Sequence, residues 1–146
     1  MSKKLILSHH EAAINHHDVY KYSNLMRTVY AKVHEIEYKY SDAVEVDGRG
    51  FKWSKIPLIH KYIDLYDEIL WVDDDVLFTN MKIDIFSFMK SMASPAIIVT
   101  FINDKEVTNF ISSGIMLFDC SDDDKKMKIK TLLNDWWNRI DSTNRS

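Results

Sequence analysis

Three consecutive carboxylates interrupt an apolar segment in the middle of the chain. They are Asp73, Asp74 and Asp75, and the segment runs from residue 69 to residue 78. Apolar runs rich in β-branched and aromatic residues are typical of strands buried inside a parallel sheet. Acids in such a strand are very costly unless they lie at its open end and meet a cation. Ligands of α/β proteins bind at that end of the sheet.

This pattern favours a site for a divalent metal ion and a phosphorylated ligand. Asp73 and Asp75 are two positions apart, so extended backbone would project both carboxylates to the same side. A hard cation such as Mg2+ or Mn2+ takes one or two carboxylates and leaves positions for phosphate oxygens and water. The alternative interpretation is a solvated acidic turn that follows an edge strand.

The hydrophobic pattern around the acids predicts that strands and helices alternate along the chain. Ser23 can cap a helix that reaches Val33, and acids from Asp122 onwards suit the start of a last helix. Residues 47–50 form a flexible turn. Further strands are expected at residues 4–8, 35–40, 96–101 and 115–118, and further helices at residues 53–66 and 83–92. This order predicts an α/β sandwich with a mostly parallel sheet.

Length and composition narrow the class of protein. The 146 residues suit one domain with a sizeable core, and the formal charge of -3 gives no electrostatic reason to expect nucleic acid as a partner. The single cysteine, Cys120, excludes an internal disulfide, fits a reducing compartment and is expected in the core. The apolar stretch near the N-terminus is too short for a signal peptide or a membrane segment. We expect a soluble, cytoplasmic protein, encoded by a bacterium or a virus.

One class of Mg2+-dependent phosphatases also ends a strand in Asp-x-Asp. In that class the first Asp is a nucleophile, the motif follows the first strand, and Thr or Val stands two positions further on. Here that position is Leu77, and the motif lies in mid-chain. Both observations count against a phosphatase.

Two segments around the acids resemble the donor-binding half of GT-A-fold glycosyltransferases. Residues 53–59 and 66–80 are most similar to family 34, the galactosyl- and xylosyltransferases, and to family 8, which includes glycogenin and bacterial lipopolysaccharide transferases. The shared pattern is a helix with a basic residue near its start, followed by Tyr-Asp-x-Ile, three hydrophobic residues and Asp-x-Asp-x-hydrophobic. Several matches in the right order are more specific than an isolated Asp-x-Asp.

Further matches extend the resemblance over roughly residues 5–140. Asn24, Tyr30-Ala31 and His34 are similar to the Asn…Tyr-Ala-x-x-His helix of family 34. Ser113-Gly114 and the apolar residues after it resemble the Asn-Ser/Ala-Gly-hydrophobic strand of both families. The resemblance implies a GT-A-like, Rossmann-type three-layer sandwich, with residues 1–146 as one catalytic domain that is short or truncated at its acceptor-binding end.

The implied activity is metal-dependent transfer of a hexose or pentose from a nucleotide-sugar, UDP-sugar by default, to a glycan or another hydroxyl acceptor. Both families retain the anomeric configuration. The implied metal ligands for Mn2+ or Mg2+ are Asp73 and Asp75. The implied donor contacts are Ser8, His9, Arg49, Lys55, Asp73 and Asp74. Contacts to the sugar or the acceptor are implied for Ser112, Ser113 and Gly114, and no catalytic residue is assigned.

The chain departs from the family pattern in two places. Ser112 stands where these enzymes usually have Asn, and no histidine follows Asp75, although relatives supply a late histidine as a metal ligand. A fragment of a longer enzyme and a relative that binds nucleotides without turnover therefore stay open beside a compact enzyme. Lys55 has its own alternative, a solvated position on an amphipathic helix. The paired histidines at residues 9–10 and 16–17 are not expected to converge on a second metal.

Overall fold

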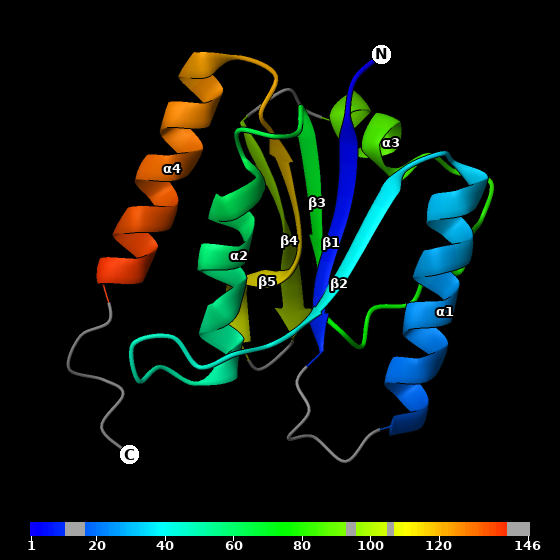
Figure 1. Cartoon of the computed structure of the whole chain (residues 1–146), viewed down its shortest axis with the longest axis horizontal. Coiled ribbons are helices and arrows are strands. Elements are labelled where there is room, and N and C mark those ends of the chain that lie inside the picture. The colour runs from blue at the N-terminus through cyan, green and yellow to red at the C-terminus, as the bar shows by residue number, and fades with distance from the viewer. Residues whose placement is uncertain (11–16, 93–95, 105–106, 140–146) are drawn as a thin grey trace.

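The computed structural model describes residues 1–10, 17–92, 96–104 and 107–139, and one sheet of five strands forms its centre (Figure 1). The order across the sheet is β2-β1-β3-β5-β4. The strands are β1 (Lys4–His10), β2 (Glu37–Asp42), β3 (Glu68–Val72), β4 (Ile97–Asp104) and β5 (Val107–Asp119). β1 pairs parallel with β2 and β3, whereas β5 runs antiparallel to β3 and β4. The prediction of a mostly parallel sheet is therefore confirmed.

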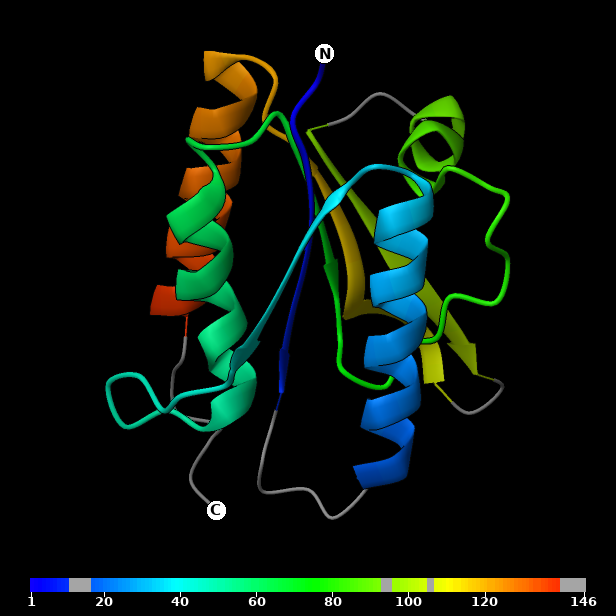
Figure 2. The ribbon, with the colours of Figure 1, turned by 45° about the vertical axis from the view of Figure 1, so that its right-hand side comes forward.

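Helices cover both faces of the sheet, as Figures 1 and 2 show from two directions. α2 and α4 lie on one face, and α1 and α3 lie on the other. The helices are α1 (His17–Val33), η1 (Phe51–Ser54, a 3-10 turn), α2 (Lys55–Tyr62), α3 (Ile85–Met92) and α4 (Asp123–Asn138). The three-layer α/β/α architecture expected from the sequence is confirmed.

Alternation along the strands produces one hydrophobic core on each face. Leu5 and Leu7 of β1 pack in the cluster that contains buried residues of α2 and α4, whereas Ile6 packs with residues of α1 and α3. All residues of β3 are buried, because helices cover both of its faces and strands flank both of its edges. β3 is thus a central strand, and the acids that follow it leave the middle of the sheet.

α1 differs from its prediction at the N-terminal end. The helix begins at His17, and Ser23 lies inside it, fully buried, instead of capping it. The single hydroxyl proton of Ser23 is shared between the carbonyls of Asp74 and Tyr20, and the contact to Asp74 is the shorter one. The capping prediction is wrong because the polar group of Ser23 is satisfied by the turn after β3, a partner that is distant in sequence.

The turn predicted at residues 47–50 and the predicted start of the last helix are confirmed. Asp47 and Gly48 have positive φ values of 53° and 71° in the predicted turn. Asp122 caps α4, and its side chain accepts a hydrogen bond from the backbone N–H of Lys125 at 2.8 Å. Cys120 is fully buried, as expected. Within the described residues, no helix combines the length and apolar character needed to cross a membrane.

Candidate functional site

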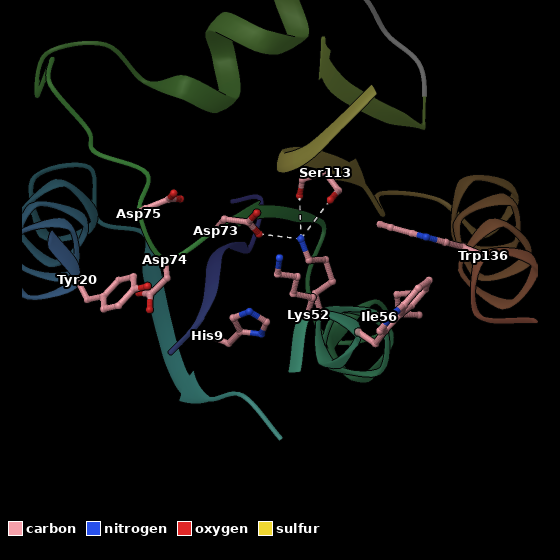
Figure 3. Close-up of a pocket in the computed structure, with 11 residues that line it drawn as sticks. His9, Tyr20, Lys52, Ile56, Asp73, Asp74, Asp75, Ser113 and Trp136 are labelled. Carbon is pink, nitrogen blue, oxygen red and sulfur yellow. Dashed lines mark hydrogen bonds and ion pairs between the residues drawn. The ribbon is translucent and has the colours of Figure 1, made fainter. Parts of the chain in front are cut away.

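A cavity of about 650 Å3 lies at the carboxyl ends of β1 and β3 (Figure 3). Its position agrees with the general rule that ligands of open α/β sheets bind beyond the carboxyl ends of the strands. It is lined by His9, Tyr20, Lys52, Trp53, Lys55, Ile56, Asp73, Asp74, Asp75, Ser113 and Trp136. The predicted acids, Lys55 and Ser113 therefore line the same cavity. β3 is a central strand, so the acids do not follow an edge strand as the alternative interpretation supposed.

An ion pair joins the buried Lys55 to the partly exposed Asp73 in this cavity. Lys55 Nζ lies 2.8 Å from Asp73 Oδ1 and donates to the hydroxyl and the carbonyl of Ser113 at 3.2 and 3.3 Å. Trp71 Nε1 donates to the same carboxylate oxygen at 2.8 Å. Lys55 is only 6% exposed, so the solvated alternative for this lysine is wrong. The contacts fix the orientation of the Asp73 carboxylate before any ligand arrives.

Asp74 is enclosed by protein donors, although it also borders the cavity. Its Oδ1 accepts hydrogen bonds from Tyr40 Oη at 2.8 Å and from Arg27 Nη2 at 3.3 Å. Its Oδ2 lies 3.1 Å from His10 Nδ1. Burial and the hydrogen bond to Asp74 raise the pKa of Tyr40, which keeps that phenol protonated and able to donate. With both oxygens engaged, this carboxylate contributes to the structure of the turn.

Asp75 is exposed, and its carboxylate has no hydrogen-bond or ion-pair partner among the residues that the structure describes. Asp73 Oδ2 also has no hydrogen-bond partner within the described residues, and the Asp73 side chain is 35% exposed. Two carboxylates with oxygen atoms to spare fit a Mg2+ or Mn2+ ion, which binds few protein groups and completes its shell with phosphate and water. No group of three His, Cys, Asp or Glu side chains suited to a metal occurs within the described residues.

His9 borders the cavity in a defined tautomer. Its Nδ1 lies 2.9 Å from Ser54 Oγ, and the single hydroxyl proton of Ser54 is donated to the carbonyl of Phe51 at 2.8 Å. Both contacts are satisfied together when His9 carries its proton on Nδ1 and presents Nε2 as an acceptor. Burial and the nearby Lys55 ammonium lower the pKa of His9, so the neutral ring is favoured. The ring also meets Trp71 edge-on, with centroids 5.0 Å apart.

Four predicted residues, Ser8, Arg49, Ser112 and Gly114, lie outside the cavity lining. Ser8 is fully buried on the α1 side of β1, because neighbouring strand residues point to opposite faces and His9 faces α2. Arg49 donates to the carbonyl of Trp137, and its guanidinium lies 3.9 Å from the centroid of that ring. Ser112 Oγ accepts a hydrogen bond from the backbone N–H of Gly114 at 3.2 Å.

The histidines do not gather at one point within the described residues. His10 faces Asp74 and Tyr20, on the side of β1 opposite to that of His9. His16 and the side chain of His17 lie outside what the structure describes.

Sequence reasoning missed Arg27, Trp71 and Tyr40, which hold the acids in place. For Arg27 a signal was present, because it shares one helical face with Ser23, Tyr30 and Ala31, at spacings of three, four and seven to eight residues. All of these are buried. A charged residue on the buried face of a helix indicates a specific partner.

Comparison with known proteins identifies both the fold and the family. The fold is that of a GT-A-like glycosyltransferase: a crystal structure of a glycosyltransferase involved in the glycosylation of the major capsid of PBCV-1 matches with a TM-score of 0.67 and 16% identity, over 94% of this chain and 67% of that one. The model of the galactosyl transferase GMA12/MNN10 family matches residues 5–141. The chain belongs to this family.

Two other comparisons add little. A crystal structure of a protein from STIV has a TM-score of 0.45 and 13% identity, over 80% of this chain and 64% of that one. Among curated proteins, none matches this chain. Membership of a glycosyltransferase family leaves no support for the phosphatase alternative.

Proposed function

We propose that this protein transfers a hexose or pentose from a nucleotide-sugar to a hydroxyl group, and that the donor binds in the cavity together with Mn2+ or Mg2+. The proposal rests on one observation: Lys55, Asp73 and Asp75 line the same cavity at the carboxyl ends of the central strands. The carboxylate, which has one oxygen without a partner, offers a negative charge to a metal ion. The lysine beside it offers a positive charge to phosphate. That combination suits a diphosphate bound through a divalent cation.

The roles of the residues follow from their surroundings. Asp73 and Asp75 would hold the ion, which, when bound, supplies charge neutralisation for the departing nucleoside diphosphate. Lys55 orients Asp73. Its ammonium group would also place a positive charge next to a phosphate oxygen of the donor. Asp74 keeps the turn in shape through its contacts with Arg27, and makes no direct donor contact in this proposal.

His9 and the aromatic wall suit the remaining parts of the ligands. His9 Nε2, as a neutral acceptor, would take a hydrogen bond from a ribose hydroxyl or a base N–H of the nucleotide. Trp53 and Trp136 line the same cavity, with ring centroids 6.5 Å apart. Their ring surfaces would pack against the donor sugar or a glycan acceptor. The resemblance to retaining families favours retention of configuration, with UDP as the default nucleotide.

The first experiment is calorimetric titration of UDP into the protein, with and without Mn2+, on the wild type and on Asp75→Ala. Binding that needs Mn2+ and is lost in the variant supports the donor site. Equal binding without metal and in the variant contradicts it. Hydrolysis of UDP-sugars in the absence of an acceptor then separates a transferase from a relative that only binds nucleotides.

A further inference from the structure

We propose that Arg27 is a positioning residue that fixes the turn Asp73–Val76 and so determines where the carboxylates of Asp73 and Asp75 stand. Arg27 lies in the middle of α1, far from the acids in sequence, and its side chain is 0% exposed. Burial of a guanidinium is very costly unless its donors are satisfied. The partners it has therefore indicate why it is there.

The backbone of the turn supplies most of those partners. Arg27 Nη1 donates to the carbonyls of Asp73, Asp74 and Val76 at 3.1, 3.0 and 3.1 Å. Two of these carbonyls belong to the acids themselves, and the third belongs to Val76, which follows Asp75. Only a conformation of the turn that directs all of these carbonyls to one point can make this set of contacts.

The remaining donors of the guanidinium lock its own position. Nη2 donates to Asp74 Oδ1 at 3.3 Å, and Nε donates to Tyr38 Oη at 3.0 Å. Tyr38 Oη in turn donates to Asn24 Oδ1 at 2.8 Å, on the same helix as Arg27. The Asp74 carboxylate balances the buried charge, and the phenol fixes the plane of the fork. Among the acids, the guanidinium contacts only the carboxylate of Asp74, so it leaves the carboxylates of Asp73 and Asp75 to the site.

The turn is held from its other side by the sheet. The N–H of Asp73 donates to the carbonyl of Gly114 in β5 at 2.8 Å, and the N–H of Val76 donates to the carbonyl of Asp73 at 3.1 Å. α1 and β5 therefore clamp the same short segment. The clamp leaves Asp75, which has no partner in the described part of the chain, as the exposed apex.

A lysine cannot replace this arginine. The guanidinium is a planar fork with donors in fixed directions, whereas an ammonium is a compact point charge with fewer donors. Arg27→Lys keeps the charge that Asp74 needs but loses most of the contacts to the carbonyls. Loss of such supporting contacts behind metal ligands typically reduces metal affinity about 10- to 100-fold.

The test combines two measurements on Arg27→Lys. The first is amide hydrogen exchange at Asp73 and Val76, compared with exchange at Leu5 and Leu7 in the core. The second is Mn2+-dependent UDP binding by calorimetry, which rests on the proposed function. We expect the exchange rate in the turn to increase by at least about 10-fold more than the exchange rate in β1. We expect the affinity for UDP to fall by about 10- to 100-fold. Leu133→Ala, in α4 on the opposite face, is the control that lowers stability without touching the turn.

Each outcome decides the proposal. Exchange in the turn that rises no more than it does in Leu133→Ala would overturn it, whatever happens to binding. If wild-type protein binds no UDP with Mn2+, the proposed function fails while the exchange experiment still decides the role of Arg27. If Arg27→Lys does not fold, the double variant Arg27→Met with Asp74→Asn removes both buried charges together, and the same local rise in exchange is expected.

Discussion

The ammonium of Lys55 lies 2.8 Å from Asp73 Oδ1, at the point where the first turn of α2 meets the end of β3. The lysine side chain is 8% exposed and the aspartate side chain 35%, so the pair has one buried and one open partner. Lys55 also donates to Ser113 of β5. One cation thus joins three elements at the edge of the cavity and, together with Trp71 Nε1, holds the Asp73 carboxylate in one orientation.

This pairing predicts opposite effects of Lys55→Met on metal and nucleotide. Removing the ammonium leaves Asp73 Oδ1 with only the hydrogen bond from Trp71 Nε1 and should raise the affinity for Mn2+ alone. UDP binding in the presence of Mn2+ should weaken about 10-fold or more because a charged partner is lost. The measurements are an electron paramagnetic resonance titration of free Mn2+ and calorimetry with UDP. Lys52→Met, at an exposed lysine of the same cavity, is the matched control and should change both affinities less. Weaker binding of Mn2+ alone in Lys55→Met would contradict the interpretation.

Asp74 and Asp75 should respond in opposite ways to replacement by asparagine. Asp74→Asn leaves the buried Arg27 charge without its counter-ion and should lower the free energy of unfolding by about 3 kcal/mol. Asp75→Asn should leave stability unchanged within about 0.5 kcal/mol and abolish Mn2+-dependent UDP binding. Urea unfolding and calorimetry on both variants check this. A stable Asp74→Asn protein together with a destabilised Asp75→Asn protein would reverse our assignment of the two acids.

Gly114→Ala tests whether Asp73 Oδ2 takes part in binding. The added methyl group would lie 3.3 Å from Ser112 Oγ and 3.4 Å from Asp73 Oδ2. The backbone of Gly114 is not in the left-handed region, so we expect the free energy of unfolding to fall by only about 1 kcal/mol. Crowding of Oδ2 should nevertheless weaken Mn2+-dependent UDP binding. Gly50→Ala is the control, because a Cβ there meets nothing within 4 Å. Unchanged affinity in Gly114→Ala would show that Oδ2 is not used.

His9 should make the protein less stable in mild acid. Burial and the Lys55 ammonium lower the pKa of His9 below its usual 6.5 in the folded state. Below pH 6.5 the unfolded chain therefore binds more protons at this site than the folded chain. The stability due to neutral His9 is fully present above pH 6.5 and is lost as the pH falls through the folded pKa, with a slope of up to about 1.4 kcal/mol per pH unit.

Urea unfolding between pH 7.5 and 5 measures this slope. His9→Asn retains a side-chain N–H for Ser54 but does not titrate, so its stability should depend less on pH in this range. The same slope in both proteins would exclude His9 as the source.

Cys120 should destabilise the protein in alkali and resist thiol reagents. Burial first, and then the Asp119 carboxylate, raise the pKa of the Cys120 thiol from 9.0 to about 12. Above pH 9 the unfolded chain loses this proton while the folded chain keeps it, so stability falls as the pH rises towards 12. Native protein at pH 8 should react with Ellman's reagent only as fast as it opens, whereas urea-unfolded protein should react at once. Cys120→Ala should show a shallower alkaline slope, and rapid labelling of the native thiol would contradict the prediction.

The amino-acid sequence by itself determined the order of the elements and the place of the acids. The apolar run before Asp73 made a buried strand unavoidable, and the turn at Asp47-Gly48 and the Asp122 cap follow from local backbone chemistry. These features depend on residues close together in the chain. The resemblance around the Asp-x-Asp motif extended that reading to the family, which the match over residues 5–141 bears out.

Only the tertiary structure decided which polar groups meet. Whether Ser8 or His9 faces the cavity depends on the phase of β1 relative to the helices that pack against it. The Asp-x-Asp spacing grouped Asp73 with Asp75 and set Asp74 apart, but only the fold shows that Asp74 is enclosed, that Asp73 is paired with Lys55 and that Asp75 is exposed. The physical reason is distance along the chain: each of these contacts joins segments between 18 and 64 residues apart, which no local pattern records.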